Sequence, residues 1–282
     1  MESQDIARGP TAAGSPRAWR RFRYPQSVIS YGSWLIAFTV IVYSIEYLNI
    51  PLDRMFGMFG RMGEILADRY YPADIEYIMD VDYIGSVIET IQMAYLGALF
   101  GLLITIPLAW FAAYNMTPSR LFVYPGARFA SMCCRAVHET IWTILFVSIL
   151  GFGMLPGVLA LTLFSAGFAA KLFAEEIEAI DMGPVEAMWA TGANLFQVMV
   201  FGVFPQVRVA FTGIGIYTWD VAFRAATVVG FFGAGGMGWY LKRNVMQIET
   251  ERVAAIILSI IVLVLISELI SAWARNFVMK MK

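Results

Sequence analysis

Long runs of mostly apolar side chains constrain this chain more than any other feature of its sequence. Six such runs occupy residues 28–47, 90–114, 135–153, 155–171, 207–232 and 253–273. A helix of about 20 apolar residues crosses the ~30 Å hydrocarbon core of a bilayer. Only 15% of the 282 residues are charged, against about 25% in soluble domains. The sequence therefore predicts an all-α, polytopic membrane protein with about six transmembrane helices.

The distribution of lysine and arginine predicts the orientation of these spans. Six spans place both ends of the chain on the same side, and cytoplasmic segments carry an excess of basic residues. If the N-terminus lies inside, the inner segments hold thirteen basic residues and the outer segments hold six. We therefore expect both termini in the cytoplasm.

The chain is predicted to have three parts. Residues 1–27 mix Gly, Pro and Ser with arginines and are typical of a cytoplasmic N-terminal tail. Residues 28–83 contain the first span and an extracytoplasmic segment whose charged, amphipathic pattern predicts one or two short interfacial helices. Residues 84–282 form the core. The tail has no early apolar run, so we expect no cleaved signal peptide.

Several functional classes find no support in the composition. The two cysteines, Cys133 and Cys134, are adjacent, and His138 is the single histidine, so no metal-ligand spacing is present. The glycine-rich sequence at residues 233–238 lacks the lysine of a phosphate-binding loop. The chain has no basic domain that would indicate binding to nucleic acid. We expect no bound cofactor, no metal and no catalytic residue in this chain, and no nucleic-acid partner.

A polar stretch at residues 175–206, which we call the knuckle, interrupts the apolar second half of the chain. Gly183 and Pro184 suit a helix start, with proline at the first helical position and Glu186 in the first turn. Gly192 suits the end of that helix. The knuckle is thus predicted to be two short helices joined by a turn.

The second helix of the knuckle has its own start and stop signals. Asn194 with Gln197 three residues later is typical of a capping box. Pro205 is expected to stop or kink the chain before the next apolar run. On the predicted topology the knuckle lies in the cytoplasm, between spans four and five.

This pattern resembles a known family. Glu186-Ala187, Gly192 and Pro205 match the spacing of the EAA loop of importer-type ABC transporter permeases, with departures at Met188, Gly202 and Phe204. The stretches 135–142, 171–181 and 223–238 resemble the phosphonate or phosphite permease subfamily. The likeness covers roughly residues 84–275 and is weakest before them.

The resemblance implies a function and a set of partners. Such permeases form dimers with an alternating-access path and take energy from two cytoplasmic ATPase subunits, which bind ATP and Mg²⁺. An extracytoplasmic binding protein would deliver a phosphonate or a related oxyanion across the bacterial inner membrane. ATPase coupling would fall on Glu186, Ala187, Gly192, Ala193 and Pro205.

The charges within the spans are candidates for a substrate path. Asp220 and Arg224 lie four residues apart, so they share one helical face and can pair. An intramembrane charge is costly and suggests function, so Arg224 could line an anion path, or the pair could be structural. Arg135 is a candidate too, although anchoring at an interface would also explain it.

The glycine run 230–238 is the last candidate. Irregular backbone is tolerated at membrane depth where it is buried or lines a cavity, and its N–H groups could form an anion nest. Gly235 and Gly236 are therefore candidate path residues, and a tight turn packed between helices is the alternative.

Two other classes of protein fit the sequence less well. An intramembrane enzyme would need a nucleophile–base pair or a metal dyad, which the spans do not show. A channel or secondary transporter would be expected to show repeated halves. The permease is preferred, with the choice among phosphonate, phosphite, phosphate or another anion, and between homodimer and heterodimer, left undecided.

Overall fold

The computed structural model describes residues 24–48 and 57–279, and all regular elements in these ranges are helices. The chain divides into two compact units, residues 1–63 and 64–282. The first unit holds α1 (Gln26–Tyr47), a helix with no buried residue. Its 22 residues would extend about 33 Å at 1.5 Å per residue. The first predicted span is confirmed as a helix.

Two short helices follow, as the amphipathic pattern predicted. They are α3 (Met58–Arg69) and α4 (Ile75–Ile78). The side chain of Asp74 caps α4 by accepting a hydrogen bond from the Tyr77 amide at 3.1 Å. Residues 49–56, which the same prediction included, and most of the predicted tail lie outside the described residues.

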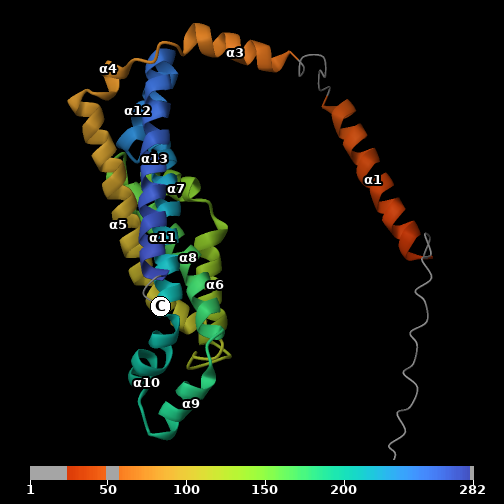
Figure 1. Cartoon of the computed structure of the whole chain (residues 1–282), viewed down its shortest axis with the longest axis vertical. Helices are drawn as coiled ribbons and strands as arrows, with labels where there is room; N and C mark the ends of the chain where they lie inside the picture. Colours follow the sequence, from red (N-terminus) through yellow and green to blue (C-terminus); the bar gives the residue numbers. More distant parts are fainter. Residues whose placement is uncertain (1–23, 49–56, 280–282) are drawn as a thin grey trace, which may run out of the picture. The chain divides into compact units, whose positions relative to one another are not determined.

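The second unit is a helical bundle (Figure 1). Its remaining elements are α5 (Val81–Ala112), α6 (Val123–Ala136), α7 (Glu139–Leu150), α8 (Met154–Glu178), α9 (Met182–Ala190), α10 (Leu195–Gln197), the π-helical segment η1 (Val198–Val203), α11 (Phe204–Val229), the 3₁₀ turn η2 (Gly230–Phe232), α12 (Gly236–Gln247) and α13 (Thr250–Met279). Helices α9 and α10 lie together at one end of this unit, away from α4 and α12.

The closest packing in the bundle joins α5 to α8. A β-carbon added at Gly97 of α5 would lie 2.5 Å from the Cβ of Leu161 on α8, and one at Gly157 of α8 would lie 3.3 Å from the Cγ of Met93 on α5. Thr105 donates a hydrogen bond to the carbonyl of Ala166 at 3.2 Å. Small residues and interhelical hydrogen bonds are the usual means of close helix approach in membranes.

Two apolar clusters hold the bundle together at different levels. One surrounds Met93, Leu161 and Phe223 and joins α5, α8 and α11. The other surrounds Trp110 and Phe173 and extends into the helices of the knuckle. The knuckle is therefore built onto the core of the bundle and is not a loop hanging from it.

The predicted third span differs from the structure. With two prolines and a glycine, residues 115–128 are typical of a short loop, and 135–153 is expected to be a continuous span. In the structure α6 already begins at Val123, and a bend of 86° separates it from α7. Pro125 is tolerated because it is the third residue of α6, where no intrahelical amide is needed. Extended backbone at Val137 and His138 ends one helix and starts the next.

Several boundaries also differ. Residues 233–252, glycine-rich at first and then polar, are typical of a re-entrant segment followed by a loop, yet residues 236–247 form α12. Helices α5 and α8 extend beyond the predicted second and fourth spans, so residues 175–178 of the knuckle are the last turn of α8. Pro107 lies inside α5.

The number of spans agrees with the expectation of about six. Within the described residues, five helical stretches are long and apolar enough to cross a membrane, and the bent pair α6–α7 would make a sixth. One of the five is the continuous stretch from Leu195 to Phe232. The chain is therefore a multi-pass, all-helical membrane protein, whereas the predicted N-in, C-in orientation stays a prediction.

The packing of α5 on α8 yields a stability prediction. Gly97→Ala should lower the melting temperature of the purified protein in detergent, because overpacking a tight contact costs about 1–3 kcal/mol. Gly85→Ala on the same helix is the matched control, since nothing lies within 4 Å of the β-carbon it would add. Equal melting temperatures for the two variants would contradict the close approach at Gly97.

Candidate functional site

The first helix of the knuckle starts earlier than predicted. Helix α9 begins at Met182, and the side chain of Asp181 caps it by accepting from the Gly183 amide at 3.0 Å. Pro184 is therefore the third helical residue, and Glu186 lies in the second turn, not the first. Aspartate is among the best N-cap residues, which explains why the helix starts there.

The turn between the two helices has the predicted form. Gly192 adopts φ +81°, the left-handed conformation that favours glycine. The amide of Gly192 donates to the Trp189 carbonyl at 3.0 Å, and the amide of Ala193 donates to the Met188 carbonyl at 3.2 Å. These bonds satisfy carbonyl groups that the end of α9 would otherwise leave without partners.

The second helix of the knuckle also starts as predicted. The Asn194 side chain accepts from the Gln197 amide at 2.9 Å, and the Gln197 side chain accepts from the Asn194 amide at 2.9 Å. This reciprocal pair is a complete capping box.

Pro205 does not stop the chain. It lies within the first turn of α11, directly after the π-helical segment η1. Proline cannot donate the amide of an α-helical turn, and its ring would collide with the carbonyl four residues before it. The wider π turn accommodates this constraint, so the chain stays helical from α10 into α11.

Polar contacts bind the start of α9 to the start of α11. The Gln206 side chain accepts from the Asp181 amide at 3.0 Å and donates to the Asp181 carbonyl at 3.1 Å. The side-chain NH₂ group of Gln206 also donates to the Gly202 carbonyl at 2.8 Å. Gln206 thus closes the base of the knuckle, a role that the sequence analysis did not assign to it.

One side of α9 is buried and the other is exposed. Val185 is fully buried in the apolar cluster with Val198 and Val203 of η1. The predicted coupling residues Glu186, Ala187, Gly192 and Pro205 are exposed, and Ala193 is half-buried. Trp189 and Phe196, which are close to them in sequence, are also exposed. The outer face of the knuckle therefore presents the Gly192 backbone, the Glu186 carboxylate and two aromatic side chains.

The predicted pair in α11 is present. The Arg224 guanidinium lies 3.0 Å from the Asp220 carboxylate. Asp220 is buried, whereas the Arg224 side chain is 46% exposed and therefore faces outward from this single chain. The second carboxylate oxygen of Asp220 is buried without a hydrogen-bond partner among the described residues. The pair thus presents one accessible cation held by a buried acid.

The third candidate charge lies apart from this pair. Arg135 is in the last turn of α6, and the neighbouring His138 caps α7 through the Thr140 amide at 3.4 Å. His138 also lies 3.4 Å from Glu139. Within residues 57–279, no hydrogen bond or ion pair joins Arg135 to Asp220 or Arg224.

The glycine run forms a tight turn packed against α5. Gly235 and Gly236 have φ of +84° and +65°. The Gly236 amide donates to the Glu89 carboxylate at 3.1 Å, and the Met237 amide donates to the Thr90 hydroxyl at 2.9 Å. Side chains of α5 therefore already occupy the N–H groups at the start of α12 that an anion nest would use.

Glu89 and Thr90 were missed by the sequence analysis. Both lie in an apolar helix, and Glu89 carries a charge within the α5 span. An acid within a span is itself a functional signal, so Glu89 could have been found. Its partner could not, because the contact joins residues 147 positions apart.

A cavity of about 300 Å³ lies beside the knuckle. Residues of α5, α8, η1 and α11 line it, among them Trp110, Phe173 and Phe211. Arg208 is the single charged residue in this lining of the described chain. An almost wholly apolar wall suits a small oxyanion poorly, because burying an ion there would be costly.

Fold and knuckle together define an all-helical, multi-pass membrane transport component. A family described as "Binding-protein-dependent transport system inner membrane component" matches residues 102–280. The phosphite transport system permease protein PtxC of Stutzerimonas stutzeri is 41% identical over 87% of this chain and 88% of its own length. The phosphate-import permease protein PhnE of Mycolicibacterium smegmatis is 31% identical over 93% of this chain and 47% of its own length.

A solved structure supports the fold alone. The MetNI methionine ABC transporter in inward-facing conformations aligns with a TM-score of 0.59 at 18% identity, covering 70% of this chain and 95% of that chain. This chain belongs to the family of binding-protein-dependent transport system inner membrane components. The resemblance to importer-type permeases of the phosphonate and phosphite subfamily is thereby confirmed.

The capping box yields a local prediction. Asn194→Ala removes the acceptor for the Gln197 amide, so hydrogen exchange at residues 195–197 should speed up by roughly fivefold, as expected for a cap worth about 1 kcal/mol. Asn194→Asp keeps an acceptor and should exchange as the wild type does. An unchanged exchange rate in Asn194→Ala, measured by mass spectrometry, would show that the capping box does not stabilise the start of this helix.

Proposed function

We propose that this chain is the permease subunit of an ATP-driven importer for a phosphorus oxyanion. The observation that carries the proposal is the knuckle, whose buried side is continuous with the apolar core of the bundle and whose outer face is exposed. Such a construction suits an element that is pushed by a partner and passes the movement to the spans.

The knuckle offers a docking face for a cytoplasmic ATPase. Gly192 at the turn tip has nothing within 4 Å of the β-carbon position, so a partner backbone can approach it closely. Trp189 and Phe196 beside it are 47% and 70% exposed. Exposed aromatic side chains are enriched at the centres of protein interfaces. ATP and Mg²⁺ would be held by the partner, and this chain would hold no cofactor and catalyse no reaction.

The remaining assembly follows from this role. Two permease subunits would enclose the path, either as a homodimer or as a heterodimer, and an extracytoplasmic binding protein would deliver the substrate. Both termini and the knuckle would lie in the cytoplasm of a bacterium, with the permease in the inner membrane. Alternating closure and opening of the ATPases would switch the path between its two sides.

Phosphite or a phosphonate is the preferred substrate. The 41% identical relative is named a phosphite permease, and shorter relatives from Escherichia coli are named putative cryptic phosphonate permeases. Phosphate is the second candidate, because the relative from Mycolicibacterium smegmatis is named a phosphate-import permease. All three are compact oxyanions, so each requires a positive partner in a low-dielectric path.

Arg224 is the residue we assign to that positive partner. Its accessible guanidinium, fixed by the buried Asp220, can donate two parallel hydrogen bonds to an oxyanion. Arg135, Gly235 and Gly236 are secondary candidates. The amides at Gly236 and Met237 would serve an anion only after Glu89 and Thr90 release them.

The substrate is tested with the chain, its ATPase and a binding protein reconstituted in liposomes. We expect ATP hydrolysis to rise when the binding protein is loaded with phosphite or a phosphonate, compared with the unloaded protein. Stimulation by phosphate alone would replace the preferred substrate with the second candidate. An ATPase that does not associate with this chain would contradict the proposed function.

Arg224 gives a separate prediction. Arg224→Ala should reduce uptake at limiting substrate by roughly tenfold or more, because a hydrogen bond to a charged group contributes about 1.5–3 kcal/mol. Arg275→Ala, which removes a cation from α13, is the control and should transport normally. Normal uptake by Arg224→Ala, with equal amounts of protein in the membrane, would remove Arg224 from the path.

A further inference from the structure

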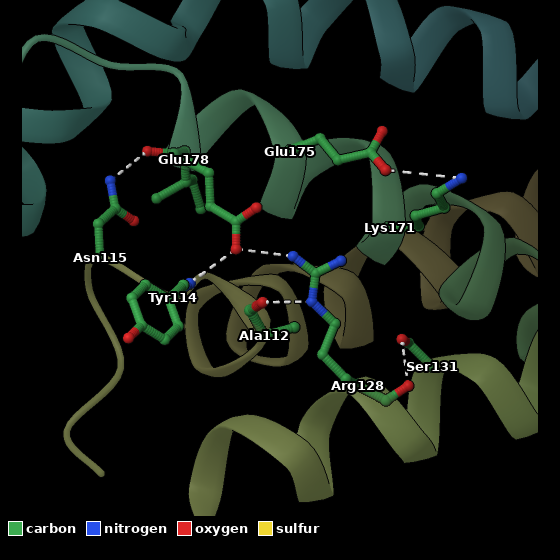
Figure 2. Close-up of polar contacts among 9 residues, drawn as sticks. Ala112, Tyr114, Asn115, Arg128, Ser131, Lys171, Glu175 and Glu178 are labelled. Carbon is green, nitrogen blue, oxygen red and sulfur yellow. Dashed lines mark hydrogen bonds and ion pairs between the residues drawn. The ribbon is translucent and has the colours of Figure 1, made fainter. Parts of the chain in front are cut away.

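A polar cluster lies where α8 ends and the knuckle begins (Figure 2). Glu178 is the last residue of α8. One oxygen of its carboxylate accepts from the Arg128 guanidinium at 2.7 Å and from the Tyr114 backbone amide at 2.8 Å. The acid is thus bonded at once to α6 and to the segment that directly follows α5.

Arg128 connects this cluster to α5. Its Nε atom donates to the carbonyl of Ala112, the last residue of α5, at 2.8 Å. Its guanidinium also lies 5.4 Å from the centre of the Tyr124 ring. A cation at the carboxyl end of a helix is favourable for the helix dipole and satisfies a terminal carbonyl. One side chain therefore bridges the ends of α5 and α8.

A second bond doubles the connection between the two helix ends. The Asn115 side chain donates to the Ile177 carbonyl in the last turn of α8 at 2.8 Å. Figure 2 shows this bond beside the contacts of Glu178 and Arg128. Two different carbonyls, of Ala112 and Ile177, are thus capped by side chains from other elements.

The position of this cluster, between α9 and the ends of α5 and α8, allows it to transmit a displacement of the knuckle to the bundle. Glu178 lies three residues before Asp181, the N-cap of α9, so a displacement of α9 that travels along the chain enters α8 at Glu178. Apolar packing is non-directional, whereas the charge-assisted hydrogen bond from Arg128 to Glu178 and the bond from its Nε to the Ala112 carbonyl fix both distance and direction. The Gln206–Asp181 contacts tie the other side of the knuckle to α11.

We propose that Arg128 and Glu178 are positioning residues that couple movement of the knuckle to α5 and α6. With the pair intact, a push on α9 moves the ends of α5, α6 and α8 together. Without it, residues 179–181 bend and part of the movement does not reach α5 and α6. This inference rests on the proposed function and adds to it the two residues through which the bundle responds.

A neighbouring ion pair provides the matched control. Lys171 and Glu175 lie 3.5 Å apart on α8, one turn from the cluster. Both belong to the same helix, and their side chains are 42% and 48% exposed, against 26% and 30% for Arg128 and Glu178. Removing the Lys171–Glu175 pair deletes a similar ion pair but breaks no contact between different helices.

The first measurement is the number of phosphite ions taken up per ATP hydrolysed in the reconstituted complex. Arg128→Ala and Glu178→Ala should lower this ratio about 2- to 30-fold, the range for mutations that alter coupling between sites. Glu175→Ala should leave it unchanged, and Glu178→Gln, which keeps an oxygen acceptor, should recover part of it. A misfolded fraction would lower uptake and hydrolysis together and leave the ratio unchanged.

The second measurement needs no ATPase and no substrate. Spin labels at position 189 on α9 and position 129 on α6 would be placed in a full chain in which Cys133 and Cys134 are replaced by serine. In liposomes the distance distribution should be narrow for the parent and for Glu175→Ala, and broad for Arg128→Ala and Glu178→Ala. Equal distributions in all four proteins would overturn the proposal.

The two measurements separate the two hypotheses. A parent complex that shows no stimulated hydrolysis with any loaded binding protein contradicts the proposed function, and the distance distributions then decide whether the pair fixes the knuckle. A parent complex that transports, with an unchanged ratio in Arg128→Ala and Glu178→Ala, contradicts the coupling role alone.

Discussion

The close approach of α5 and α8 is the contact on which the rest of the bundle depends. Gly97 and Gly157 remove the side chains that would separate the two helices, and Thr105 bonds directly to the backbone of α8. Helices in a bilayer gain little from burying apolar surface against each other, because lipid is also apolar. Contact at short range therefore has to supply the packing energy.

This contact also positions the functional elements at each end of the bundle. At one end, the carboxyl ends of α5 and α8 lie close enough for Arg128 and Glu178 to connect them, and the knuckle starts there. Farther along, Glu89 and Thr90 of α5 hold the glycine turn that starts α12. A shift between α5 and α8 would thus be felt both at the knuckle and at that turn.

Much of the fold could be predicted from local chemistry. Hydropathy located most of the spans, and capping rules located the turn at Gly192 and the box at Asn194 because each depends on neighbours in sequence. The start of α6 was missed because Pro125 and Gly126 are typical of loops as well as of first turns. The break between α6 and α7 was missed because it lies at Val137 and His138, where there is neither glycine nor proline. The start of α9 was misplaced because Asp181 is a stronger cap than the glycine–proline pair that follows it.

The candidate site was less predictable, because its parts meet only through the fold. The Asp220–Arg224 pair was found since it lies within one helical turn. The contacts of Glu89 with Gly236 and of Arg128 with Glu178 join residues 147 and 50 positions apart, and no local pattern reveals them. Pro205 was interpreted as a stop or a kink because proline disrupts the interior of an α-helix. Here it lies in the first turn of α11, and the preceding π-helical segment η1 accommodates it.

The proposed function depends most on the knuckle being the docking face of an ATPase, and site-specific photocrosslinking in native membranes tests this directly. A photoreactive residue at position 196, in the exposed face of the knuckle, should capture the ATPase subunit. The same residue at position 248, exposed in the turn between α12 and α13, should not. Capture from position 248 and none from position 196 would contradict both the orientation and the role given to the knuckle.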